Sequence, residues 1–163
     1  KAQSHANARG LMQMLPSTAK REARALGIPF ADYKLFEPAY NMQLGSYHLQ
    51  ELVADFGGSY AMAAAGYNAG PSKPYQCRER FGNPRAGAYQ AIQWIEAIPY
   101  GETRNYVQRI LENYQVYQAL HSGGRAPLTI SCRSNRSGPP EPPSPSTATE
   151  QLAADPAIRD TDR

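Results

Sequence analysis

The amino-acid sequence predicts an all-α domain followed by a disordered, proline-rich C-terminal tail. In residues 1–121 apolar side chains recur at helical spacing, and no alternating pattern typical of a strand competes with them. Glycine, proline and N-capping residues divide this part into segments of helical length. Residues 122–163 contain no Phe, Trp or Tyr and carry half of the 14 prolines, so they cannot bury enough apolar surface to fold.

The first helix is predicted to begin with Ser17 and Thr18, which supply N-cap chemistry, and to end at about Leu26. Gly27 followed by Pro29 is a stop signal.

The second helix is predicted from Pro38, which suits a first helical turn, to Phe56, where Gly57 and Gly58 end it. Its apolar stripe comprises Met42, Leu49, Leu52, Val53 and Phe56.

Ser59 is predicted to cap a short alanine-rich helix that runs through Ala65 and stops before Gly70 and Pro71. Residues 86–97 form the next predicted helix. The segments around 28–37 and 71–85 are expected to be long, ordered loops.

The last helix is predicted from about Glu102 to Leu120, with one apolar face and a polar face opposite. The residues on the apolar face are Tyr106, Val107, Ile110, Leu111, Tyr114 and Tyr117.

Length and charge limit the classes of function. A chain of 163 residues holds one ordinary domain and has no room for a second large one. The net charge of +3 is too small, and too evenly spread, to indicate nucleic-acid binding. No apolar run approaches the roughly 20 residues of a membrane span.

Cys77 and Cys132 could pair in an oxidising compartment. No Cys/His spacing resembles a metal site, so we expect no metal and no cofactor.

Three short segments carry polar residues that core packing does not readily explain. The first is Gly10-Leu11-Met12-Gln13-Met14-Leu15-Pro16. Its Leu11, Met14 and Leu15 are expected in the core. Gln13 differs, because an amide among apolar residues needs a partner or must face a cleft.

The second segment is Gly66-Tyr67-Asn68-Ala69-Gly70-Pro71. A helix C-terminus explains Gly70 and Pro71. It does not explain Tyr67 and Asn68, a hydroxyl and an amide together at a helix end, where polar groups commonly contact ligands.

The third segment runs from Trp94 to Tyr106 and contains Ile98-Pro99-Tyr100-Gly101-Glu102-Thr103-Arg104. Glu102 either complements the dipole of the last helix or lines a cleft, and both interpretations stay open. His5, His48 and His121 have no matching ligand spacing, so they are expected on the surface or in satisfied core positions.

In this order and spacing, Gly-Leu-Met-Gln, Tyr-Asn-Ala-Gly-Pro and Ile-Pro-Tyr-x-Glu-Thr-Arg-x-Tyr resemble three motifs of the soluble lytic transglycosylase (SLT) family. The resemblance covers Lys1 to about Leu120. It implies a lysozyme-like helical domain, related to goose-type lysozyme, that cleaves peptidoglycan in the periplasm or cell envelope as a monomer without a cofactor. Substrate-binding residues carried over by motif are Met12, Gln13, Tyr67, Asn68 and Glu102.

One element of the family pattern is missing. In the family a Glu-Ser motif precedes Gly-Leu-Met-Gln by about 15 residues, and its Glu is the acid/base. That Glu would lie upstream of Lys1, so we expect these 163 residues alone to be inactive. In the reaction that the resemblance implies, the 6-hydroxyl of N-acetylmuramic acid attacks its own C1 and leaves a 1,6-anhydro end. Two alternatives remain: a glycan-binding module without activity, and a goose-type lysozyme relative that hydrolyses with water.

Overall fold

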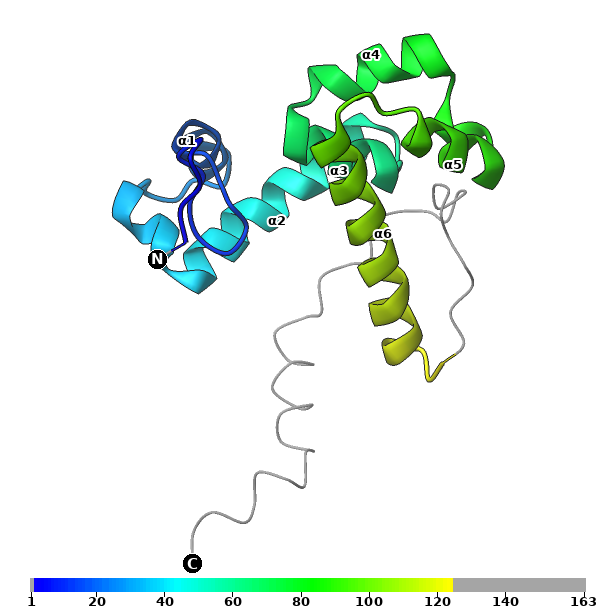
Figure 1. Cartoon of the computed structure of the whole chain (residues 1–163). Helices are drawn as coiled ribbons and strands as arrows, with labels where there is room; N and C mark the ends of the chain where they lie inside the picture. The colour runs from blue at the N-terminus through cyan, green and yellow to red at the C-terminus, as the bar shows by residue number, and fades with distance from the viewer. Residues whose placement is uncertain (1, 125–163) are drawn as a thin grey trace, which may run out of the picture. The chain divides into compact units, whose positions relative to one another are not determined.

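The computed structural model of the protein describes residues 2–124. These residues form six α-helices and two short 3-10 helices and contain no β-strand, which confirms the all-α class (Figure 1). The predicted tail lies outside the described residues from position 125 onwards, and so does Cys132, so the question whether it pairs with Cys77 stays open. The elements are α1 (Pro16–Ala25), η1 (Asp32–Phe36), α2 (Pro38–Asp55), α3 (Tyr60–Ala69), α4 (Ser72–Phe81), η2 (Pro84–Ala86), α5 (Ala88–Glu96) and α6 (Gly101–His121).

Helix α1 begins differently from the prediction. Its N-cap is Leu15 and its first residue is Pro16, and no side chain caps the helix. At the first position of a helix the backbone N–H has no partner within the helix, so a proline there loses no hydrogen bond. The helix can therefore begin at Pro16 without the hydroxyls of Ser17 or Thr18. Ser59 does cap α3 as predicted, because its Oγ accepts a hydrogen bond from the Met62 amide.

The prediction of a long loop over residues 71–85 is wrong, since most of it forms α4 and η2. Pro71 is the N-cap of α4, and Pro74 lies within its first turn. A proline in the first turn breaks no helical hydrogen bond. Pro71 therefore follows the end of α3, as predicted, and also stands at the start of α4.

The larger hydrophobic core is built around α3, which contacts α2, α4 and α6. Residues 61–65 of α3 are all buried, and four of these five are alanines, whose small side chains let the neighbouring helices approach closely. Trp94 of α5 and Val107 and Leu111 of α6 supply large side chains to the same core.

A second core lies between α1, η1 and the first half of α2. Its buried members are Met14, Ala19, Ala23, Leu35 and Leu44. Complete burial of a leucine such as Leu35 or Leu44 stabilises the fold by about 2 kcal/mol. Helix α2 contributes to both cores. Its Leu44 belongs to the second core, whereas Leu52 and the C-cap residue Phe56 belong to the larger one.

Several apolar residues predicted to be buried are exposed. On α2, Met42 is 47% exposed, because the neighbouring Asn41 occupies the inward position. On α6, Ile110 and Tyr117 are exposed, whereas Val107 and Leu111 form the buried face. Leu11 and Leu15, expected in the core, are also exposed, and of the three apolar residues of their segment that were expected there only Met14 is buried.

In the part of the chain that the structure describes, no helix has both the length and the apolar character needed to cross a membrane.

Candidate functional site

A pocket of about 610 Å³ brings together all five residues that the sequence predicted to line a cleft. Met12 and Gln13 come from the segment before α1, Tyr67 and Asn68 from the C-terminal end of α3, and Glu102 from the first turn of α6. Tertiary folding thus collects residues that are far apart in the sequence. The pocket is also lined by Ser4, Ala6, Ala8, Leu11, Leu15, Tyr106 and Ile110.

A tight turn presents Met12 and Gln13. Arg9 and Met14 exchange two backbone hydrogen bonds, of 2.9 and 3.0 Å, and so close the turn. Gln13 lies within it at a φ of 49°, a value that costs a residue other than glycine about 1 kcal/mol. Its side-chain Nε2 donates a 2.7 Å hydrogen bond to the carbonyl of Gly10. The amide that the sequence left without a partner therefore has one, at the edge of the pocket.

Asn41 fixes this turn to the rest of the fold. Its side chain is fully buried, and its Oδ1 accepts a 2.7 Å hydrogen bond from the Met12 amide. Its Nδ2 donates to the carbonyls of Arg9 and Leu35, both at 2.9 Å. The fit leaves no room at Gly10, where an added Cβ would lie 2.2 Å from the Leu35 carbonyl oxygen.

Tyr67 connects the turn to α3. Its hydroxyl donates a 2.7 Å hydrogen bond to the Met12 carbonyl and lies 3.2 Å from the sulfur of Met14. Burial, and to a smaller extent the neighbouring Tyr106, raises the pKa of Tyr67 far above that of a free tyrosine. The hydroxyl is therefore a permanent donor at physiological pH.

Asn68 is oriented by α6. The Thr103 hydroxyl donates a 2.7 Å hydrogen bond to Asn68 Oδ1, and Thr103 is itself buried. This contact fixes the amide plane of Asn68 at the pocket wall.

Glu102 is exposed in the first turn of α6 and is the only carboxylate among the described residues that line the pocket. It also lines an adjoining pocket of about 260 Å³ with Asn68, Lys73 and Tyr100. The two interpretations of Glu102 are therefore compatible, since a carboxylate here lies in the helix dipole and in the cleft at once.

Sequence reasoning missed two kinds of site residue. Tyr106 and Ile110 were assigned to a packed face, and helical periodicity cannot distinguish packing against protein from lining a pocket. Asn41 and Thr103 contribute by holding Met12 and Asn68, and only their burial reveals them. The lining as a whole combines amides and a carboxylate with apolar and aromatic surface, which suits a ligand that has both polar groups and apolar faces, such as a sugar.

Two family models and several curated proteins match this chain. The model of the transglycosylase SLT domain matches residues 1–90, and that of the soluble lytic transglycosylase helical domain matches residues 97–125. The chain is 37% identical over 132 residues to the soluble lytic murein transglycosylase of Salmonella typhimurium and 35% identical over 130 residues to that of Escherichia coli K12. Each alignment covers 78% of this chain and 19% of the relative, so the chain spans about a fifth of their length.

Solved structures show the same fold. An inactive glutamate-to-glutamine mutant of the lytic transglycosylase Slt from Pseudomonas aeruginosa is 33% identical, with a TM-score of 0.67, over 83% of this chain and 22% of that chain. The 70 kDa soluble lytic transglycosylase in complex with bulgecin A is 28% identical, with a TM-score of 0.70, over 82% of this chain and 21% of that chain. The lysozyme-like helical fold that the motifs implied is thereby confirmed.

Proposed function

We propose, on the premise that this chain belongs to the transglycosylase SLT domain family, that its pocket binds the glycan strands of peptidoglycan. The observation that carries the proposal is the single pocket lined by Met12, Gln13, Tyr67, Asn68 and Glu102. Three separate motifs predicted these residues. A volume of about 610 Å³ falls in the range typical of small-molecule sites.

The polar groups of the pocket fit an N-acetylated sugar. The Asn68 amide, held by Thr103, can bond hydroxyl or acetamido groups, and the Glu102 carboxylate accepts from sugar hydroxyls. The ring of Tyr106 and the side chains of Leu11 and Ile110 provide surface for the apolar face of a pyranose. Because the relatives act on murein, as their names state, we place the protein in the periplasm or cell envelope and expect it to act as a monomer.

The proposed reaction cleaves the β-1,4 bond between N-acetylmuramic acid and N-acetylglucosamine. A glutamic acid protonates the glycosidic oxygen, and the bond from C1 to that oxygen breaks. The resulting carboxylate takes the proton of the muramic acid 6-hydroxyl while the 6-oxygen bonds to C1, which gives a 1,6-anhydro end. Since the nucleophile belongs to the substrate, high effective molarity replaces the second carboxylate of ordinary glycosidases.

We assign the acid/base role to the glutamate of a Glu-Ser segment that these 163 residues do not contain. Glu102, the carboxylate that the pocket does contain, is exposed. A general acid that works at neutral pH needs apolar, partly closed surroundings. Glu102 is therefore assigned to binding.

The test is an assay of purified murein for anhydromuramic ends. The 163-residue chain should give none, and a chain extended upstream by the Glu-Ser segment should give them, unless that Glu is changed to Gln. In the extended chain, Glu102→Gln should lower kcat/KM by roughly 10–100-fold through the loss of a charged hydrogen bond. Glu112→Gln, a matched change on an exposed part of the same helix, should have no effect.

Three outcomes would contradict the proposal. Anhydro product from the short chain would place the acid within these 163 residues. Reducing muramic ends without anhydro product would identify a hydrolase. Binding of the glycan by an extended chain that does not cleave it would leave a binding module.

A further inference from the structure

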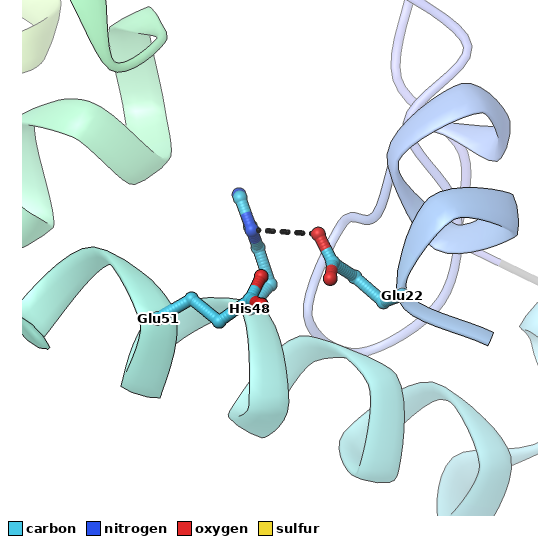
Figure 2. A group of neighbouring side chains, drawn as sticks. All are labelled: Glu22, His48 and Glu51. Carbon is cyan, nitrogen blue, oxygen red and sulfur yellow. Dashed lines mark ion pairs between the residues drawn. The ribbon is translucent and has the colours of Figure 1, made fainter. Parts of the chain in front are cut away.

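Glu22, His48 and Glu51 form a cluster outside the glycan pocket. Glu22 comes from α1, whereas His48 and Glu51 lie one helical turn apart on α2. Each offers one potential ligand atom, and these atoms all lie within 4.8 Å of one another. Figure 2 shows the three side chains pointing toward a common point between the two helices.

The Glu22 carboxylate is incompletely satisfied. The residue has no exposed surface, and its Oε1 lies 3.1 Å from His48 Nδ1 and accepts a 2.5 Å hydrogen bond from Arg21. Its Oε2 is also buried and has no hydrogen-bond partner. A carboxylate oxygen deprived of both water and a donor is unfavourable unless a cation or a proton reaches it.

A route from solvent leads to the cluster. His48 and Glu51 line a pocket of about 460 Å³, to which Asp55 adds a further carboxylate. A cation entering there would meet His48 and the two carboxylates, and also the guanidinium of Arg21, which lines the same pocket. Entry from solvent is one of the requirements for a metal site.

From this geometry we propose that Glu22, His48 and Glu51 bind a divalent transition-metal cation, with zinc as the best match. One imidazole nitrogen with carboxylate oxygens is a ligand set that zinc accepts. Three protein ligands leave a further coordination position, which would face the pocket. No metal-site pattern is visible in the sequence, because Glu22 is remote from the other two ligands. Only the spacing His48-x-x-Glu51 places two of them on one helix face.

Arg21 is the rival cation. Its guanidinium bonds Glu22 Oε1, and its Nη2 lies 3.3 Å from His48 Nδ1. Its side chain is 62% exposed, however, so it can turn toward solvent when a metal ion enters. Metal and guanidinium then compete for the same carboxylate, and removal of Arg21 should strengthen metal binding.

The surroundings of His48 suit a ligand. The side chain of His48 is only 12% exposed and lines the pocket of about 460 Å³ together with Glu51. The ring also contacts that of Tyr67, with centroids 5.4 Å apart. A metal ion here would tie α1 to α2 beside a residue of the glycan pocket, yet its binding does not depend on the proposed function.

The experiment uses the 163-residue chain freed of metal by a chelator. Titration with Co²⁺ should give the absorption bands of a protein-bound ion at one equivalent, and zinc should displace the cobalt. His48→Gln and Glu51→Gln should each weaken zinc binding by at least about tenfold. Arg21→Gln should strengthen it. His121→Gln and Glu112→Gln, changes at exposed positions of α6, should leave it unchanged.

Thermal unfolding provides a second readout. Zinc should raise the unfolding temperature of the unaltered chain and of His121→Gln, but not that of His48→Gln. The proposal is overturned if the unaltered chain binds neither metal. It is equally overturned if His48→Gln and Glu51→Gln retain full affinity, or if affinity is lost with His121→Gln, which would indicate adventitious binding at the surface.

Discussion

The Tyr67 hydroxyl and the Met12 carbonyl are joined by a 2.7 Å hydrogen bond that connects two of the three sequence motifs. Tyr67 also packs against both hydrophobic cores. Tyr67 therefore both lines the pocket and holds the two cores together. A change at Tyr67 should affect stability as well as binding.

Tyr67→Phe should lower the free energy of unfolding by about 1 kcal/mol, because it removes the hydrogen bond and leaves the Met12 carbonyl without this donor. Urea unfolding measures the difference. Tyr33→Phe is the matched control, since Tyr33 is 70% exposed and should lose nothing measurable. Equal stability of Tyr67→Phe and the unaltered chain would show that the contact contributes nothing.

Asn41→Ala should be more severe, with a loss of about 2–4 kcal/mol. The substitution removes three hydrogen bonds at a fully buried position and takes their partner from the Met12 amide and the Leu35 carbonyl. The Arg9 carbonyl keeps the hydrogen bond from the Met14 amide. Gln50→Ala, on an exposed position of the same helix, is the control. Because Asn41 holds the turn that carries Gln13, glycan affinity should fall as well. If affinity stays unchanged in the destabilised variant, Asn41 supports the fold without positioning the pocket.

Tyr106 should make the protein sensitive to alkali. Burial raises the pKa of Tyr106 above its ordinary value of 10.0, so between that value and the folded pKa the unfolded chain binds fewer protons than the native one. The stability contributed by this difference is present below about pH 10 and lost as the pH rises through the folded pKa. Urea unfolding at about pH 8 and about pH 11 should show a smaller loss for Tyr106→Phe than for the unaltered chain. An identical loss in both proteins would contradict this role of Tyr106.

The sequence predicted elements whose ends carry clear stop and start residues. The helix from Pro38 is an example, because glycines follow its end. The prediction was wrong for α4, which was expected to be a loop although its prolines, at the N-cap and in the first turn, are compatible with a helix. The prediction that Met42 is buried was also wrong. The three hydrogen bonds of Asn41 turn Asn41, and not Met42, toward the interior.

For the site, residue type was informative where a polar group stood among apolar ones, as with Gln13 and Asn68. The supporting contacts were not predictable, since those of Asn41 and Thr103 depend on partners far away in the sequence. Glu22 shows the same limit. It lies within the charged run Lys20-Arg21-Glu22, which is typical of a solvated helix face, yet it is fully buried.

Amide NMR of the 163-residue chain, titrated with a tetrasaccharide of alternating N-acetylglucosamine and N-acetylmuramic acid, tests whether the glycan binds in the proposed pocket. We expect the largest shift changes on the residues that share one pocket, which are Met12, Gln13, Tyr67, Asn68 and Glu102. The absence of shift changes would contradict glycan binding at this pocket, and so would changes centred instead on the apolar groove between α5 and α6 that contains Ile92, Leu111 and Val116.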